Sequence, residues 1–535
     1  MGSATIAKLD QTIASVFPGW GRRRAEARLH GRIAAAGLEA LATYEAADKG
    51  RTSSDWTARN KSADKAILGD YATLTARARA AVRDDWAAES IVAGHVRHIV
   101  GTGITAKANA RDFVTGKPLV GFNVNLDRLW KRWASTPALC DVEGKKSFVD
   151  FQTLLISEEV TVGQAFVVFC YVPRPNDVGL VLQAIEPEQL DTSITQNRDT
   201  GYQIKHGIEI DPYGRTVAIW AYTKEHPYDK MTGDSVRIPA DRLVHFMRPR
   251  RVRQTHGVTR LAPVLRQLWN RKMFSEYTVL RARFEACCGA TIETDPLASP
   301  TSILGLKTTG TGTGLTEDRN ENKQFNFEPS MIWELPAGKK ATFHAPQVPG
   351  GQFDPFIKRN VGETAAGVGL DYATVARDYS GGNFSSQRQG LLEVWDETDP
   401  EQIRVISLFC QPTRERFIEA AVMEGRLIAL EWNHAPQRAA YVETDWRPKA
   451  KHWIDPAVQA AAAKMKLEMR LTTRRAIANE LDEDWKENIT QIHDEEAFAA
   501  ERNVTLPEAG GNAKVGPREP RPEASMQPAS VEVPT

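Results

Sequence analysis

The sequence predicts an α+β fold, because long stretches of helical periodicity flank a central stretch of short β-rich runs. Over residues 74–100 apolar and alanine residues recur at helical spacing, until Gly101 and Gly103 end the pattern. Over residues 164–222 the runs are short and separated by turns that contain proline, glycine, asparagine or aspartate. A chain of 535 residues that is 41% hydrophobic has enough apolar material for several subdomains with their own cores.

The individual elements follow from the same patterns. Strands are expected over 165–172, 180–185 and 216–222, with two more near 331–335 and 341–345. Long helices are expected over 261–288, which would span roughly 40 Å, over 353–368, and over about 385–422, after a break at residues 381–383. Three further helices are expected between 456 and 501, and either Thr472 or Thr473 should cap the second of them.

Composition narrows the class of protein. Five cysteines with no CxxC spacing favour neither a disulfide framework nor structural zinc. The sequence has no run of about 18 apolar residues and no apolar segment near its beginning. We therefore expect a protein made in the cytoplasm, without a membrane partner.

Motifs for catalysis are absent from the sequence. It has no GxxxxGK[ST] phosphate loop and no GxSxG nucleophile elbow, and the Thr-Gly alternation at 308–314 lacks the flanking strand and helix of a nucleotide site. His95 and His98 could share a helix face, but no acidic partner completes a metal site, so packing or surface positions are favoured. We predict no catalytic residues, metal or cofactor, and no enzymatic activity. If DNA is pumped by an assembly that contains this chain, another protein hydrolyses the ATP.

Two blocks of like charge stand out in a chain whose 68 basic and 68 acidic residues otherwise balance. Residues 242–260 contain no carboxylate and form a basic strip of six arginines: Arg242, Arg248, Arg250, Arg251, Arg253 and Arg260. Arginine pairs with carboxylates as well as with phosphates, so the strip fits a subunit interface, a solvated face or direct DNA contact. Residues 480–501 carry nine acidic residues and one lysine. That segment fits either the wall of a passage that DNA crosses without sticking or a solvated helix face.

Several segments, in sequence order, resemble the lambda-type family of tailed-bacteriophage portal proteins. They include Pro18-Gly19-Trp20 before an arginine cluster, WTARNKSA at 56–63, VGTGI at 100–104 and IEPEQLD at 185–191. The most specific is TAAGVGLDYATVARDYSGGNFSSQRQGLLE at 364–393, which is similar to the family segment that contains the tunnel loop. The resemblance extends from about residue 18 to about residue 501.

The resemblance implies a portal fold of wing, stem, clip and crown, assembled as a cyclic ring. Residues 1–260 and 385–448 would form the wing, 261–288 and 353–368 the stem helices, and 289–352 the clip with a flexible loop at 296–330. Residues 369–384 would form the tunnel loop, 449–502 the crown and 503–535 a disordered tail. The expected DNA-facing residues are Asp378, Tyr379, Ser380, Gly381, Gly382, Asn383, Phe384 and Ser385. Gly381 and Gly382 would let the loop shift, or would merely end one helix and start the next.

The function that this resemblance implies is a dodecameric channel at one vertex of a phage capsid, through which double-stranded DNA is packaged and ejected. The implied partners are the terminase large subunit, the major capsid protein and a head-tail adaptor protein, and the implied location is the virion. The alternatives are a head-maturation enzyme, such as a protease or nuclease, and another minor head structural protein.

Overall fold

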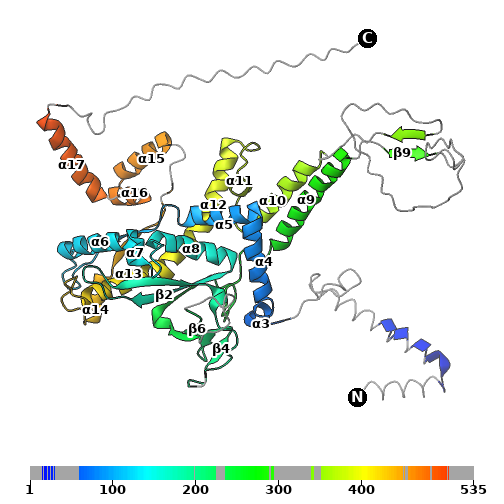
Figure 1. The fold of residues 1–535 in the computed structure, drawn as a ribbon, viewed down its shortest axis with the longest axis horizontal. Helices are drawn as coiled ribbons and strands as arrows, with labels where there is room; N and C mark the ends of the chain where they lie inside the picture. The colour runs from blue at the N-terminus through cyan, green and yellow to red at the C-terminus, as the bar shows by residue number, and fades with distance from the viewer. Residues whose placement is uncertain are drawn as a thin grey trace, which may run out of the picture. The chain divides into compact units, whose positions relative to one another are not determined.

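The structure is a computed structural model, and its chain divides into two compact units, residues 1–65 and 66–535. It describes residues 60–197, 199–223, 235–287, 291–294, 339–342, 351–449, 451, 456–481, 483, 485–502 and 504. In the first unit it also describes a few residues between 15 and 30, which are mostly helical. Helix α3 (Ala63–Ile67) precedes the body of the second unit. Helix and sheet are mixed throughout that body, as the α+β prediction requires (Figure 1).

The single helix predicted over 74–100 is two helices, and this part of the prediction is wrong. Helix α4 (Tyr71–Asp84) ends where Asp85 adopts an extended backbone, and α5 (Trp86–Ile99) continues in a different direction (Figure 1). The Asp85 carboxylate accepts a hydrogen bond from the Ala87 amide at 2.8 Å, which caps α5. The same carboxylate pairs with buried Arg271 of helix α9. Periodicity alone did not reveal this bend because apolar residues continue through it.

Two antiparallel sheets form the β-rich part. The first has the order β3-β2-β8, with β2 (Gln164–Tyr171) between β3 (Leu180–Ile185) and β8 (Leu243–Met247). The second has the order β4-β5-β6-β7, from β4 (Gln203–Lys205), β5 (Ile208–Ile210), β6 (Thr216–Ala221) and β7 (Val236–Pro239). A separate pair joins β1 (Thr105–Ala108) to β11 (Thr444–Arg447). The three strands predicted in this region are confirmed to within one residue at each end.

The main hydrophobic core lies between the first sheet and the surrounding helices, and a smaller core lies between the two sheets. Aromatic side chains dominate one end of the main core, where Trp130, Trp133, Phe148, Phe409 and Phe417 have ring centroids 5.0 to 5.9 Å apart. They come from α6 (Val120–Ser135), α8 (Phe148–Thr161), the π-helical segment η5 (Ile406–Cys410) and α13 (Gln411–Met423). The core therefore joins chain segments nearly 300 residues apart. Short helices α7 (Pro137–Cys140) and α14 (Ala435–Tyr441) lie at its edge.

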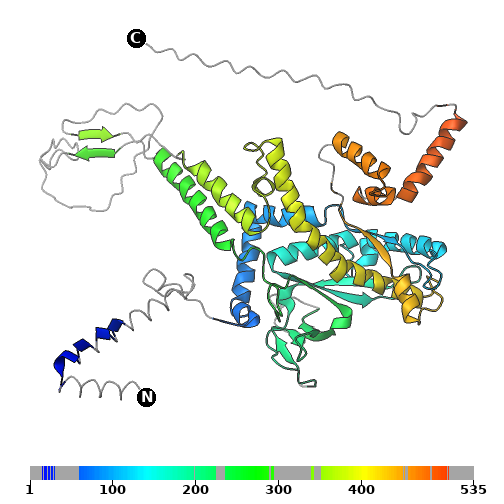
Figure 2. The same cartoon turned by 180° about the vertical axis from the view of Figure 1, so that it is seen from behind.

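Two long helices project from the body side by side, as both views show (Figures 1 and 2). They are α9 (Leu265–Cys287) and α10 (Phe353–Gly367), close to the predicted 261–288 and 353–368. Phe274 of α9 packs on Phe353 and Phe356 of α10, at centroid distances of 5.7 and 4.8 Å. Between them a strand pair is described, β9 (Thr291–Thr294) with β10 (Lys339–Thr342). The loop predicted at 296–330 and the strand at 331–335 lie outside the described residues, and so does the tail 503–535 apart from Val504.

The remaining helices follow the predicted order. After α11 (Tyr372–Ala376), α12 (Phe384–Val405) runs through η5 into α13, which matches the long helix expected over 385–422. Three helices follow near the end of the chain: α15 (Pro456–Glu468), α16 (Arg474–Glu480) and α17 (Trp485–Glu501). The Thr473 hydroxyl accepts a hydrogen bond from the Ala476 amide at 3.1 Å and so caps α16, which settles the choice between Thr472 and Thr473.

Two glycines allow the chain to cross itself below α9. Gly163 has a φ of +101°, and a Cβ atom there would lie 2.4 Å from the backbone of Val258. A Cβ atom on Gly257 would lie 1.9 Å from the Gly163 carbonyl oxygen. No side chain fits at either position, because the two backbones are in direct contact.

Candidate functional site

The eight residues predicted to face DNA lie in one loop and the start of the next helix. Residues 377–383 connect α11 to α12, and Phe384 and Ser385 form the first positions of α12. Tyr379 is 59% exposed, and Ser380, Gly381, Gly382, Asn383 and Ser385 are also exposed. The structure thus brings these residues together at one exposed site.

Asp378 organises the first half of the loop. Its carboxylate accepts hydrogen bonds from the Ser380 amide at 3.0 Å, from the Ser380 hydroxyl at 2.6 Å and from the Tyr372 hydroxyl at 3.1 Å. Lys358 of α10 lies 3.6 Å away. The bonds from Ser380, followed by the one from Tyr372, lower the pKa of Asp378 to about 2. The carboxylate therefore stays ionised and holds the loop at any pH near neutrality.

The second half of the loop is held by the beginning of α12. The Asn383 side chain accepts a hydrogen bond from the Ser386 amide at 2.8 Å and caps the helix. The Gln387 amide group donates to the carbonyl oxygens of Tyr379 at 2.8 Å and Gly382 at 3.3 Å. Three side chains thus fix a loop of seven residues at both ends.

Gly381 and Gly382 do not adopt the left-handed conformation that would require glycine. The left-handed residue of this loop is Arg377, with a φ of +53°, at the end of α11. A Cβ atom on Gly381 would meet nothing within 4 Å, and one on Gly382 would meet only the flexible side chains of Gln387 and Ser386. In this conformation the two glycines therefore end one helix and precede the next without backbone strain.

The basic strip is not one continuous surface, and its interpretation is wrong for Arg260. This side chain is 2% exposed, and its guanidinium lies 2.7 Å from Glu159 of α8 and 2.9 Å from Glu401 of α12. Burial alone would lower the pKa of Arg260, but the two carboxylates outweigh it and raise the pKa. Arg260 therefore joins segments within one protomer and is not available to DNA or to a neighbouring subunit.

Arg248 and Arg404 complete this buried ion-pair cluster. Arg248 lies 3.4 Å from Glu401 and 3.5 Å from Glu397, and Arg404 pairs with Glu401 and lies 3.6 Å from Glu159. Sequence reasoning missed Glu159, Glu401 and Arg404, because the partner carboxylates are about 100 to 150 residues away from the strip. Only Glu401 and Arg404, one helical turn apart within a predicted helix, carried a signal of pairing.

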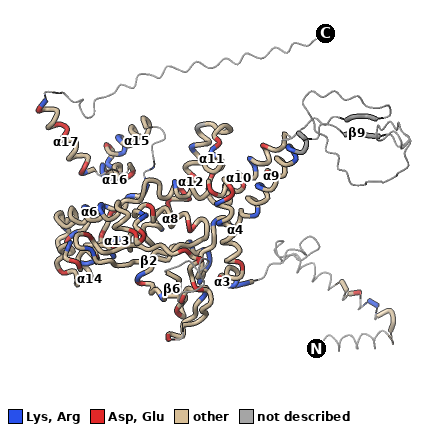
Figure 3. Tube along the Cα trace, in the orientation of Figure 1, with Lys and Arg blue, Asp and Glu red and all other residues tan. Residues whose placement is uncertain are grey.

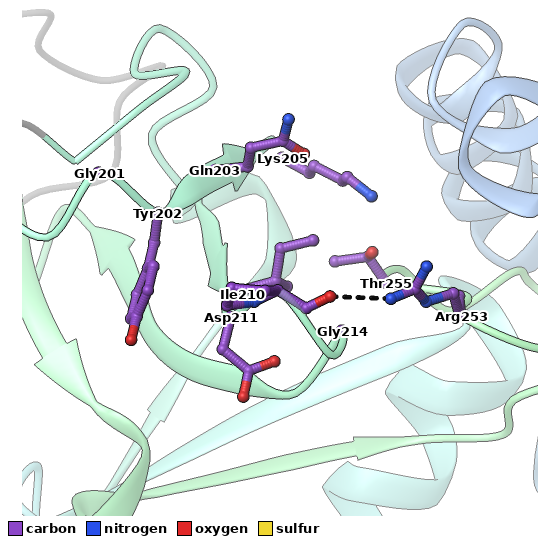
Figure 4. A pocket seen from close by; sticks show the side chains of 10 residues that line it. Gly201, Tyr202, Gln203, Lys205, Ile210, Asp211, Gly214, Arg253 and Thr255 are labelled. Atoms are coloured by element: carbon purple, nitrogen blue, oxygen red, sulfur yellow. Dashed lines mark hydrogen bonds between the residues drawn. The ribbon is translucent and has the colours of Figure 1, made fainter.

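The other strip arginines lie at the surface. Arg253 has a φ of +59°, donates a hydrogen bond to the Pro212 carbonyl at 2.9 Å, and lines a cavity of about 410 Å³ with Lys205 and Asp211 (Figure 4). Arg242 lines a separate cavity of about 370 Å³ beside Arg416. Arg250 and Arg251 are exposed, and their amides donate to the Gln254 side chain at 2.8 and 3.1 Å.

His95 and His98 are packing residues of α5. Both are buried, at 0% and 9% exposure. Burial, followed by the charge of Arg260, lowers the pKa of His95 to about 3, and burial followed by Lys449 lowers that of His98 to about 4. Among the residues described, no three or more His, Cys, Asp or Glu side chains are arranged to hold a metal ion. Within the same ranges, no helix has the length and apolar character needed to cross a bilayer.

Acidic residues concentrate in α17, whereas positive and negative charges are interspersed over most other described helices (Figure 3). The helix carries Glu487, Asp494, Glu495, Glu496 and Glu501, with Lys486 as its single cation. All of these side chains are exposed. The structure therefore places the predicted acidic segment on a helix with its charge in solvent.

Comparison with known proteins agrees with the resemblance seen in the sequence. The family model described as "Phage portal protein, lambda family" matches residues 49–402. A protein of Halomonas phage phiHAP-1 named "Probable portal protein" is 27% identical over 438 residues, which cover 80% of each chain. "Portal protein B" of Escherichia phage lambda is 22% identical, over 82% of this chain and 85% of its own length.

Solved structures give weaker likenesses. A chain from the virion of a native gene transfer agent particle is 11% identical, with a TM-score of 0.42 over 77% of this chain and 94% of its own. A portal protein of the HK97 family from Corynebacterium diphtheriae is 10% identical, with a TM-score of 0.29 over 76% of this chain and 99% of its own. Because the family model spans well over half of the 535 residues, the chain belongs to the lambda family of phage portal proteins.

Proposed function

We propose that this chain assembles into the portal ring of a tailed-phage head and conducts double-stranded DNA during packaging and ejection. The observation that carries the proposal is the match of the lambda-family portal model to residues 49–402. The paired helices α9 and α10 supply the element that a stem needs, since they project together from the body (Figure 2). The named relatives are structural portal proteins, and we propose that this chain likewise catalyses no reaction.

The width of the stem helices supports a ring of twelve. An α-helix with its side chains is about 10–12 Å across. Twelve helices side by side would have their centres on a circle about 3.9 widths in diameter, which leaves a clear bore of roughly 30 Å. DNA would pass with room for water and ions. A closed cyclic ring also requires that one face of each subunit fit a different face of its neighbour.

The loop over residues 377–383 and the first turn of α12 would face the DNA in this ring. Ser380, Asn383 and Ser385 offer uncharged hydrogen-bonding groups, and the fixed charge of Asp378 repels phosphate. Each cation that neutralises a phosphate adds affinity and slows sliding, so a loop with this composition holds DNA only weakly. The acidic α17 would act in the same way along the passage.

The remaining partners follow from the same proposal. A separate terminase would hydrolyse ATP and push DNA inward, the major capsid protein would surround the ring at one vertex, and a head-tail adaptor would bind after packaging. The protein would be made in the host cytoplasm and become part of the virion. Of the basic strip, the exposed arginines Arg242, Arg250, Arg251 and Arg253 remain candidates for contact with a neighbouring subunit or DNA.

The native mass of the purified protein tests the proposal. Twelve copies of the 59.4 kDa chain would weigh about 713 kDa. A closed ring of that mass, or of eleven or thirteen copies outside a capsid, is the expected result. A stable monomer or dimer at every salt concentration, also in the presence of capsid protein, would contradict it and favour a head-maturation enzyme, which an activity assay would then detect.

A further inference from the structure

Helix α15 carries an apolar stripe that nothing in its own chain covers. Val458, Ala462, Met465 and Met469 follow one another at steps of four, three and four, so they lie on one side of the helix and its final turn. Val458, Met465 and Met469 are 60 to 63% exposed, and no residue of α15 is buried. A helix of 13 residues is marginal in water by itself, so this stripe needs a partner.

Helix α17 has two distinct faces. At 100° per residue, Trp485, Ile489, Ile492 and Glu496 fall on one side, and Glu495 lies at its edge. Ile489 and Ile492 remain 47% and 52% exposed. Glu487, Asp494 and Glu501 are spaced by seven residues and form an acidic row on the opposite side.

The charges around the two apolar stripes are opposite. Lys466 borders the stripe of α15, and the segment from α15 to α16 has five cationic residues against two acidic ones: Lys464, Lys466, Arg470, Arg474 and Arg475 against Glu468 and Glu480. Glu495 and Glu496 border the stripe of α17. Pairing α15 with α15, or α17 with α17, would bring like charges together, whereas pairing α15 with α17 brings opposite charges together.

We propose that the α15 stripe of one copy is covered by the Ile489–Ile492 face of α17 from a second copy of this chain, with Lys466 beside Glu496. This inference rests on the proposed ring, in which every contact joins two different surfaces of identical subunits. The acidic row Glu487, Asp494 and Glu501 then faces away from the contact. The hydrophobic stabilisation of α15 and α17 therefore depends on assembly.

Cross-linking within purified rings tests the contact. Two full-length variants, Met465→Cys and Ile492→Cys, are mixed in equal amounts, assembled, and isolated at the mass of the ring. They are treated with a bifunctional thiol reagent that spans two packed helices, whose axes lie about 8–10 Å apart. The expected product is a cross-linked dimer and nothing larger, because each copy carries one new thiol. Rings made of either variant alone are the matched controls and should give no such dimer.

Charge reversal adds a second readout. Lys466→Glu in the first variant, or Glu496→Lys in the second, should reduce the yield of dimer about fivefold, and the two reversals together should restore it. Rings of full mass without the dimer, or with equal dimer in the controls, would overturn this proposal and leave the ring intact. If no ring forms under any condition, both proposals fail.

Discussion

Replacing Arg260 with alanine separates a role inside the protomer from a role on the surface. The change removes a guanidinium that lies 2.7 Å from Glu159 and 2.9 Å from Glu401. Both carboxylates are almost fully buried, at 1% and 5% side-chain exposure. Without Arg260 they keep Arg404, at 3.6 Å from Glu159, as a remaining partner.

The expected loss of stability follows from that geometry. Removing one partner of a buried ion pair costs about 3–5 kcal/mol, because it leaves an uncompensated buried charge. Arg404 continues to offset part of the charge, so we expect about 3 kcal/mol for Arg260→Ala. Arg260→Lys keeps the charge but loses the planar fork and should fall between the two. The exposed neighbour in sequence, Arg251→Ala, should change stability by no more than about 0.5 kcal/mol.

Urea unfolding followed by tryptophan fluorescence measures these differences. All variants are compared in the unassembled fraction at one protomer concentration, because assembly adds stability by mass action. An Arg260→Ala protein as stable as Arg251→Ala, but with a smaller assembled mass, would refute the reasoning. That result would mean that Arg260 acts between subunits.

Three further predictions concern the backbone crossing, the loop and the buried histidines. Gly257→Ala should prevent folding, because its Cβ atom would lie 1.9 Å from a carbonyl oxygen, whereas Gly381→Ala should fold normally; equal soluble yields of the two would contradict this. Asn383→Ala should cost α12 about 1 kcal/mol and speed amide hydrogen exchange in its first turn, and unchanged exchange there would exclude the cap. The pKa of His95 is lowered from its usual 6.5 to about 3, so its contribution to stability is complete above pH 6.5 and is lost as pH falls towards 3. His95→Leu should therefore reduce the pH dependence of the unfolding free energy by about 1.4 kcal/mol per pH unit between pH 6 and 4, and an unchanged slope would show that His95 is not buried neutral.

Most elements could be predicted from local patterns. β3 has the predicted bounds, and the helix pair 265–287 and 353–367 follows from apolar spacing, because each pattern lies within a single element. The bend at Asp85 was missed, since a capping aspartate inside a continuous apolar pattern also fits the surface of one long helix. The loop at 377–383 was located by family resemblance, but its bonding through Asp378 depends on a helix 14 residues earlier and on Lys358. No local pattern contains that information.

The basic strip shows why charge counted along a sequence does not measure charge available at a surface. Six arginines within 19 residues and no carboxylate suggest a strongly positive face. In the fold, Arg260 is buried between two glutamates, Arg248 is paired with Glu397 and Glu401, and Arg253 is bonded to a carbonyl oxygen. The cost of burying a charge forces each buried arginine to find a carboxylate, and those carboxylates come from α8 and α12. The cluster therefore ties three distant segments together where the chain enters α9, and it removes from the surface cations that would otherwise slow DNA.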